Sequence, residues 1–201
     1  ETMAEDMQSN LLLASILAEN LIEGSDNNDT LSGTNGDDLI IGGQGDDTLL
    51  GNHGDDTYLF EQGDGSARIY DAGGTDTVTF GQGIEQSALS VTRNATSLFI
   101  TLLAPEGQPT GDVLQIENVF DFDGTLKEGA LERFTFTDGS ALKIDEVISL
   151  IEQTPTDGDD TLYGTEQADT IEALGGNDTL YGGAGDDVYR FSLGDGQDTI
   201  F

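Results

Sequence analysis

Residues 24–59 read GSDNNDTLS, GTNGDDLII, GGQGDDTLL and GNHGDDTYL, which are four successive blocks of nine residues that each begin with Gly. The sixth place of every block is Asp, and the eighth is a large apolar or aromatic residue. Glycine allows the left-handed backbone of tight turns, whereas apolar residues next to Thr are typical of short strands. Each block therefore predicts one turn followed by one strand.

The same period continues along the chain. After a two-residue shift at Phe60 and Glu61 it covers residues 62–79, and it returns over 155–190 and again over 193–201 after a second shift at Phe191 and Ser192. Residues 51–70 and 182–201 share one layout, including the pattern F-x-x-G-D-G. The sequence therefore predicts two arrays of repeats, separated by residues 80–152.

Blocks of this kind offer the oxygen atoms that calcium prefers. Because glycine has no side chain, backbone carbonyls of neighbouring turns can approach one point closely. Calcium takes about six to eight oxygen ligands from carboxylates and carbonyls together, whereas magnesium demands near-octahedral geometry and keeps its waters. A Gly-rich turn with Asp in a constant place therefore favours calcium over magnesium.

The pattern G-G-x-G-x-D-x-U-x resembles the calcium-binding nonapeptide of the RTX (repeats-in-toxin) family. The resemblance implies an all-β fold with two right-handed parallel β-rolls, a form of β-solenoid, in which two blocks make one turn. It also implies that calcium lies between turns stacked on the same edge, with about six Ca²⁺ ions in this chain. The expected division is an N-terminal capping helix (1–23), a first roll (24–79), a capping region (80–152) and a second roll (153–201).

The resemblance also implies which residues bind the ions. The expected Asp pairs are Asp29–Asp47, Asp38–Asp56, Asp56–Asp76, Asp160–Asp178, Asp169–Asp187 and Asp178–Asp198. Carbonyls of the first four loop places complete each shell. Besides these Asp residues, the implied metal-site residues are Gly33, Thr34, Asn35, Gly36, Gly42, Gly43, Gln44, Gly45, Gly51, Asn52, His53, Gly54, Gly74, Gly158, Gly176, Gly182, Gly183, Ala184, Gly185, Gly194 and Gly196.

Three positions depart from the pattern. Ala67 stands where the second array has Asp198, so we expect the site between the loops of Asp47 and Ala67 to be weak or empty. Asn27 and Gln167 replace Gly at the fourth place, and Gln tolerates a left-handed backbone poorly. The site near Gln167 is therefore predicted to be doubtful.

Charge points to a chain that folds when it binds cations. The sequence has 40 acidic and 6 basic residues among 201, a formal net charge of −34. Such a chain repels itself and does not collapse without counter-charge. Calcium would supply that charge, so its binding energy becomes folding energy. Extracellular calcium modules have dissociation constants of about 10⁻⁴–10⁻³ M, so folding after export is expected.

Several classes of partner and anchor are disfavoured. The acidic surface repels phosphates, which argues against nucleic acid, and neither cysteine nor an apolar run of membrane-spanning length is present. The N-terminus does not read as a cleaved signal peptide. The family resemblance implies type I secretion from a Gram-negative bacterium. We expect the uncleaved secretion signal beyond this sequence, in a longer polypeptide.

The segments before and between the two arrays are predicted to cap the ends of the rolls. Residues 3–22 place apolar side chains at helical spacing, and residues 20–23 (NLIE) are echoed by 149–152 (SLIE) before the second array. Residues 80–152 resemble a haemolysin-type calcium-binding-related domain. Alternating apolar runs there predict antiparallel strands, and we expect Leu98, Ile100, Leu102, Phe134 and Phe136 to pack on the end of the first roll. The expected strands are 89–93, 97–103, 113–119 and 133–137, with turns at 93–96 and 138–139 and a short helix from Asp145 to Ile151.

Catalysis finds little support, since the single histidine, His53, lies at the third place of a block and no nucleophile or metalloprotease motif occurs. We therefore expect no enzyme but a calcium-loaded structural spacer of a secreted toxin, adhesin or enzyme. The alternative is a binding module that recognises glycan, ice or a host surface. Thr at the seventh place of most blocks, and Tyr70, Tyr163 and Tyr181 at the ninth, would form its exposed rows.

Overall fold

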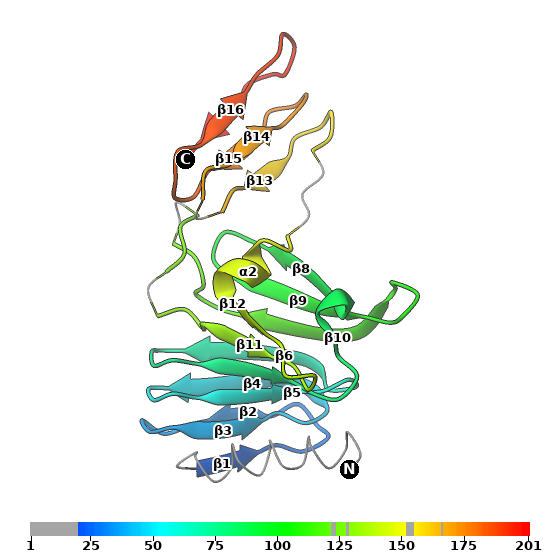
Figure 1. Cartoon of the computed structure of the whole chain (residues 1–201), viewed down its shortest axis with the longest axis vertical. Helices are drawn as coiled ribbons and strands as arrows, with labels where there is room; N and C mark the ends of the chain where they lie inside the picture. Colours follow the sequence, from blue (N-terminus) through cyan, green and yellow to red (C-terminus); the bar gives the residue numbers. More distant parts are fainter. Residues whose placement is uncertain (1–19, 122–123, 128, 152–154, 166) are drawn as a thin grey trace.

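The computed structural model describes residues 20–121, 124–127, 129–151, 155–165 and 167–201, which form an all-β solenoid (Figure 1). Successive strands alternate between two parallel sheets, as the repeat predicts. The first roll contains β1 (Asn20–Glu23), β2 (Thr30–Ser32), β3 (Asp38–Ile41), β4 (Gly45–Asn52), β5 (Thr57–Phe60), β6 (Gly65–Asp71) and β7 (Thr77–Phe80). One sheet orders β1-β3-β5-β7 and the other β2-β4-β6.

The register of the roll places the eighth residues of alternate blocks side by side. Leu49 pairs with Leu31 on one side and with Ile69 on the other, and Tyr58 pairs with Ile40 and Val78. Leu49, Ile69, Tyr58, Ile40 and Val78 are all buried in one core. The two-residue shift at 60–61 lengthens one turn without changing this register.

The central region continues both sheets of the first roll instead of forming a separate layer. Its elements are η1 (Gln86–Ala88), β8 (Leu89–Arg93), β9 (Leu98–Leu103), β10 (Pro109–Ile116), β11 (Arg133–Thr135), β12 (Ala141–Lys143) and α2 (Ile144–Ile148). Strands β10-β9-β8 extend the sheet beyond β6, and β11-β12 extend the sheet beyond β7. The five residues expected to pack there are buried in the core of the first roll, so that prediction is confirmed.

Two details of the central region differ from the predictions. β10 and β11 pair in parallel with β6 and β7, and only their other edges are antiparallel, because each continues a coil of the solenoid. Lys143 rather than Asp145 is the residue before α2, and Glu146 accepts a hydrogen bond from the Lys143 amide at 2.8 Å. The expected turn at 93–96 is present, where the side-chain oxygen of Asn94 accepts from the amides of Thr96 and Ser97.

Most of the predicted N-terminal capping helix, residues 1–19, lies outside the residues that the structure describes. Residues 20–23, expected to end that helix, form β1 and pair in parallel with β3. The echo at 149–152 therefore does not reflect one structure, since Ser149 ends α2 whereas Asn20 begins a strand.

The second array contains β13 (Thr161–Tyr163), β14 (Thr170–Glu172), β15 (Thr179–Tyr181), β16 (Val188–Arg190) and β17 (Thr199–Ile200). These strands also pair in parallel, in the orders β13-β15-β17 and β14-β16. The second array lies at the opposite end of the molecule from β1, beyond the central strands (Figure 1). Among the described residues, no helix is long and apolar enough to cross a membrane.

Candidate metal centre

Turns of alternate blocks lie one above the next and form four stacks of loops. The stacks are 24–29 with 42–47 and 62–67; 33–38 with 51–56 and 71–76; 155–160 with 173–178 and 193–198; and 164–169 with 182–187. In every predicted Asp pair, the backbone amide of the earlier Asp donates to Oδ1 of the later Asp at 2.8–3.0 Å. The structure therefore brings together all six Asp pairs that the family resemblance implies.

The first loop of each stack satisfies its own carboxylate. Oδ2 of Asp29, Asp38, Asp160 and Asp169 accepts the amide of the second-place residue at 2.6–2.7 Å and its hydroxyl at 2.8–3.1 Å. The second-place residues are Ser25, Thr34, Thr156 and Thr165. These hydrogen bonds lower the pKa of Asp29 below its ordinary value. The outermost loops are therefore closed by hydrogen bonds within the loop.

Later loops leave a carboxylate oxygen free. Oδ2 of Asp56, Asp76 and Asp178 is buried and has no hydrogen-bond partner, and these residues are at most 1% exposed. A buried carboxylate without a partner is costly unless a cation or a proton neutralises it. These three oxygens therefore fit a bound cation between the loops.

Oxygen atoms also line the gaps between loops in other stacks. A Cβ added at Gly24 would overlap the carbonyl oxygen of Gly42, and one added at Gly164 would overlap that of Gly182. A Cβ at Gly51 would overlap Oδ2 of both Asp56 and Asp71. Glycine is required at these first places because oxygen atoms occupy the side-chain direction. Such an all-oxygen set suits a hard cation such as calcium.

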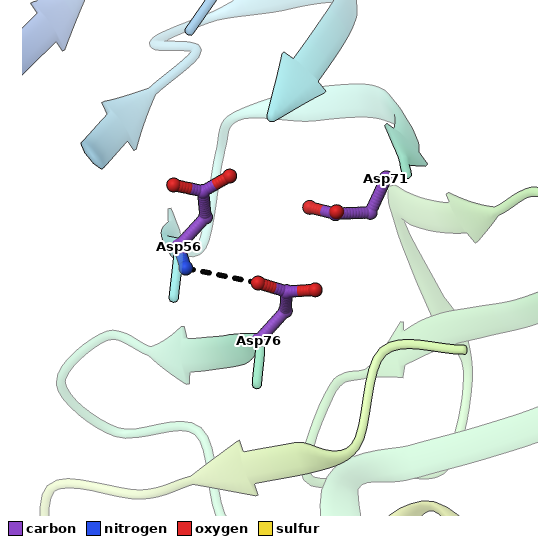
Figure 2. A group of neighbouring side chains, drawn as sticks. All are labelled: Asp56, Asp71 and Asp76. Carbon is purple, nitrogen blue, oxygen red and sulfur yellow. Dashed lines mark hydrogen bonds between the residues drawn. The ribbon is translucent and has the colours of Figure 1, made fainter. Parts of the chain in front are cut away.

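Three carboxylates meet in the stack of loops 33–38, 51–56 and 71–76. One oxygen from each of Asp56, Asp71 and Asp76 lies within 4.8 Å of the others. Figure 2 shows their carboxylates gathered in one space, with the Asp56 amide donating to Asp76. Within the part of the chain that the structure describes, this is the one such group of three.

Burial and mutual repulsion oppose charge in this group. Burial raises the pKa of Asp56 to about 7 and that of Asp76 to about 8, and the negative charge of Asp71 adds to both shifts. Burial also raises the pKa of Tyr58, whose hydroxyl donates to the Asp71 carboxylate. A bound divalent cation would offset the burial and the repulsion that raise the pKa values of Asp56 and Asp76.

The loop of Ala67 is closed in a different way. β4 and β6 begin early, at Gly45 and Gly65, and pair directly through Asp47 and Ala67. The carboxylate of Asp112, which is 5% exposed, accepts the amides of Gly63 at 3.1 Å and Gly65 at 3.0 Å. Strand pairing and a carboxylate from β10 therefore stabilise this loop without an Asp at its sixth place.

The structure also places His53 and Gln167, which lie in two of the stacked loops. His53 is exposed in its loop, with its side chain open to water. The amide of Gln167 donates to the Thr165 hydroxyl at 3.2 Å, as the amide of Gly36 does to Thr34 at 3.1 Å. The Gln167 loop thus keeps the hydrogen bond of a loop that has Gly at this place.

Three acidic residues that contact the stacked loops were not predicted from the sequence. Asp71 had a visible signal, since it is the one acidic residue at the first place of any block. Glu132 and Asp112 had none, because they lie outside the repeats. The amide of Asp76 donates to Glu132 Oε2 at 2.7 Å, so Glu132 takes the place of the next Asp in its stack.

The family of RTX calcium-binding nonapeptide repeats matches the chain, in 4 copies, over residues 23–58 and 154–189. The two matched segments carry RTX calcium-binding nonapeptide repeats. Four of the six stacked Asp pairs lie within the matched residues: Asp29–Asp47, Asp38–Asp56, Asp160–Asp178 and Asp169–Asp187.

Two solved RTX-type structures are similar to this chain. The AlgE6R3 subunit of the mannuronan C5-epimerase from Azotobacter vinelandii matches with 22% identity and a TM-score of 0.32, over 47% of this chain and 72% of its own. The extracellular lipase LipA from Serratia marcescens matches with 20% identity and a TM-score of 0.37, over 90% of this chain and 31% of its own. This chain thus spans about a third of the lipase's length. The comparison with curated proteins gave no match.

Proposed function

We propose that this chain is a calcium-dependent folding and spacer module of a larger secreted protein. The supporting observation is the set of buried, unpaired oxygens of Asp56, Asp76 and Asp178, which face the spaces between stacked RTX loops. A folded state with these oxygens bare is costly, and a cation removes that cost. The roll is therefore expected to be stable when loaded and unstable when the metal is removed.

The net charge of −34 makes the coupling stronger. Every ion that binds between two loops reduces repulsion along the whole roll and also ties consecutive coils together. Metal binding and folding then become one equilibrium, as in other small metal-dependent domains. About six ions, one for each Asp pair, would load both arrays, and the additional site between the Asp47 and Ala67 loops would be weak or empty.

The proposal also covers how the chain is secreted and what kind of larger protein contains it. RTX repeats are typical of secreted proteins, and calcium outside cells is high enough to fill sites of the expected affinity. We infer that the chain leaves a Gram-negative cell by type I secretion as part of a longer toxin, adhesin or enzyme. Any catalysis would then reside in another part of that polypeptide, since His53 lies exposed in a loop among carboxylates that serve calcium.

The proposal is tested by far-ultraviolet circular dichroism of the whole chain during calcium titration. Strand content should be low in excess chelator and should rise at or below about millimolar calcium. Magnesium at the same concentration should induce much less strand, because it demands near-octahedral geometry and keeps its waters. Strand content that is unchanged by chelator would contradict the proposal.

One observation favours the alternative of a ligand-binding surface. Thr161, Thr179 and Thr199 are in register across β13, β15 and β17 and form a short row of hydroxyls. Against it, Tyr181 stacks on Tyr163 and Phe201 at 4.9 Å, so these rings cover one another's faces. Binding on a glycan array, or thermal hysteresis, by the calcium-loaded chain would decide in favour of the alternative.

A further inference from the structure

We propose that Asp71 makes the site between loops 51–56 and 71–76 the tightest cation site of the chain, with Asp71 as a third carboxylate ligand beside Asp56 and Asp76. This inference rests on the proposed calcium-dependent folding. It adds a ligand that the repeat pattern does not supply and a rank order among the sites. The ligand class is a hard, multiply charged cation, which is calcium outside the cell or a trivalent lanthanide in the laboratory.

The geometry of the site sets it apart from the others. In most loops the first place is Gly, whereas Asp71 brings a carboxylate to the space where Asp56 and Asp76 already meet, all within 4.8 Å (Figure 2). The Gly51 Cα borders the same space, since a Cβ there would overlap Oδ2 of both Asp56 and Asp71. Oxygen atoms therefore line it from two consecutive loops.

Two buried carboxylate oxygens in this group lack a hydrogen-bond partner, and this points to a bound cation. Oδ2 of Asp56 and Oδ2 of Asp76 are buried and lack any hydrogen-bond partner, although Oδ1 of each accepts an amide from the preceding loop. Asp56 is 1% exposed and Asp76 is 0% exposed. These oxygens are out of reach of bulk water and available to a cation.

Asp71 itself is held in position from two sides. The amide of Gly73 donates to its Oδ1 at 3.0 Å, and the Tyr58 hydroxyl donates to its Oδ2. Tyr58 is buried, so this contact is shielded from solvent. A ligand oriented in this way loses little freedom when the metal binds, and outer partners of this kind strengthen metal sites.

Charge then ranks the sites. Affinity of calcium loops rises with the number of charged ligands and with rigidity. The stack of Asp160, Asp178 and Asp198 is the matched case, because Asp178 Oδ2 is equally buried and unpaired. Its first-place residues, however, are Pro155, Ala173 and Leu193, which carry no charge. The site of Asp71 therefore has one negative ligand more and should fill first.

Terbium(III) luminescence excited through tyrosine tests the inference on the whole chain, because Tyr58 lies beside the proposed site. The first equivalent of terbium should give strong emission in the wild type. Asp71→Asn and Asp71→Gly should shift this phase to concentrations at least about tenfold higher, by analogy with the 10–100-fold effects of lost metal-site partners. Asp71→Gly restores the residue that most loops have, so folding of the loop is preserved.

Two controls complete the experiment. Tyr58→Phe should abolish the first emission phase while calorimetry still detects the first equivalent, whereas Tyr189→Phe should leave that phase intact. Asp178→Asn should weaken a later phase only. A first phase that is unchanged by both Asp71 substitutions, or that persists in Tyr58→Phe, would overturn the inference. Absence of calcium binding by the wild type in calorimetry would instead refute the proposed function itself.

Discussion

At the scale of single residues, the second place of the repeat separates two kinds of loop. Loops that open a stack have Ser or Thr there, and its amide and hydroxyl bind the Asp of the same loop, as Thr34 does with Asp38. Most later loops instead have a residue with a left-handed backbone at this place, such as Gly43, Asn52, Leu174 and Gly183. A Ser or Thr at the second place therefore marks the loop where a stack begins.

This distinction predicts the effect of Thr34→Ala. The hydroxyl of Thr34 donates to Asp38 and accepts the amide of Gly36 at 3.1 Å, much as a Ser or Thr does at the start of a helix. Its loss should lower the free energy of unfolding of the calcium-loaded chain by about 1 kcal/mol, the usual cost of removing such a cap. Urea unfolding in saturating calcium measures this, and Thr34→Ser should retain most of the stability. Equal losses in both variants would contradict the role of the hydroxyl.

At the scale of elements, the central strands continue the roll by imitating its coils. β11 pairs in parallel with β7 and places Glu132 where the next Asp of the stack would lie. β10 pairs in parallel with β6 and places Asp112 over the Gly63 and Gly65 amides. Each stack of the first roll therefore ends on a carboxylate from the central region.

Replacing Glu132 tests this termination. Glu132→Ala leaves the amide of the fully buried Asp76 without an acceptor, which should cost about 1–3 kcal/mol of stability. Glu132→Gln keeps an acceptor but removes the charge, so it should cost less. Hydrogen exchange of the Asp76 amide should quicken in the Ala variant and stay slow in the Gln variant. Slow exchange in both would show that Glu132 is not the partner that protects this amide.

The family resemblance implied the rolls and the Asp pairs, and the repeat locates each pair because its two residues lie 18 residues apart, or 20 where a two-residue shift intervenes. The roles of Glu132 and Asp112 could not be predicted, since Glu132 acts on Asp76 from 56 residues away in a segment without the period. The helical spacing of residues 3–22 also misled at 20–23. There, hydrogen bonding to β3 outweighs local helix propensity and makes a strand.

At the scale of the whole molecule, the described residues form two hydrophobic cores of unequal size. The larger joins the first roll to the central region, whereas the smaller contains Leu162, Ile171, Ala173 and Leu180 with Tyr189 packed against them. Arg93 contacts both parts, since its guanidinium lies 3.2 Å from the Phe120 ring centroid and 4.3 Å from that of Tyr163. We therefore expect the second array to depend more on bound calcium than the first, because its core buries less apolar surface.

Two cores predict two unfolding transitions for the calcium-loaded chain in calorimetry. The second array should melt at the lower temperature and should respond first to limiting chelator. Leu180→Ala should lower that transition alone and Ile100→Ala the other alone, since each removes a fully buried side chain at a cost of about 2–5 kcal/mol. A single transition shifted by both substitutions would show instead that the two arrays unfold together.

The hydrogen bonds between sixth-place Asp residues all point one way along the chain, from the amide of an earlier Asp to the carboxylate of a later one. The exposed bonds at the fifth place point the other way, as from the Asp46 amide to the Asn28 side chain. Cutting away a later layer leaves a sixth-place N–H group in a buried or partly buried position without its acceptor, whereas cutting away an earlier layer leaves a carboxylate and an exposed fifth-place amide that water can satisfy. The two ends of an array are therefore not equivalent sites for shortening or fusing it.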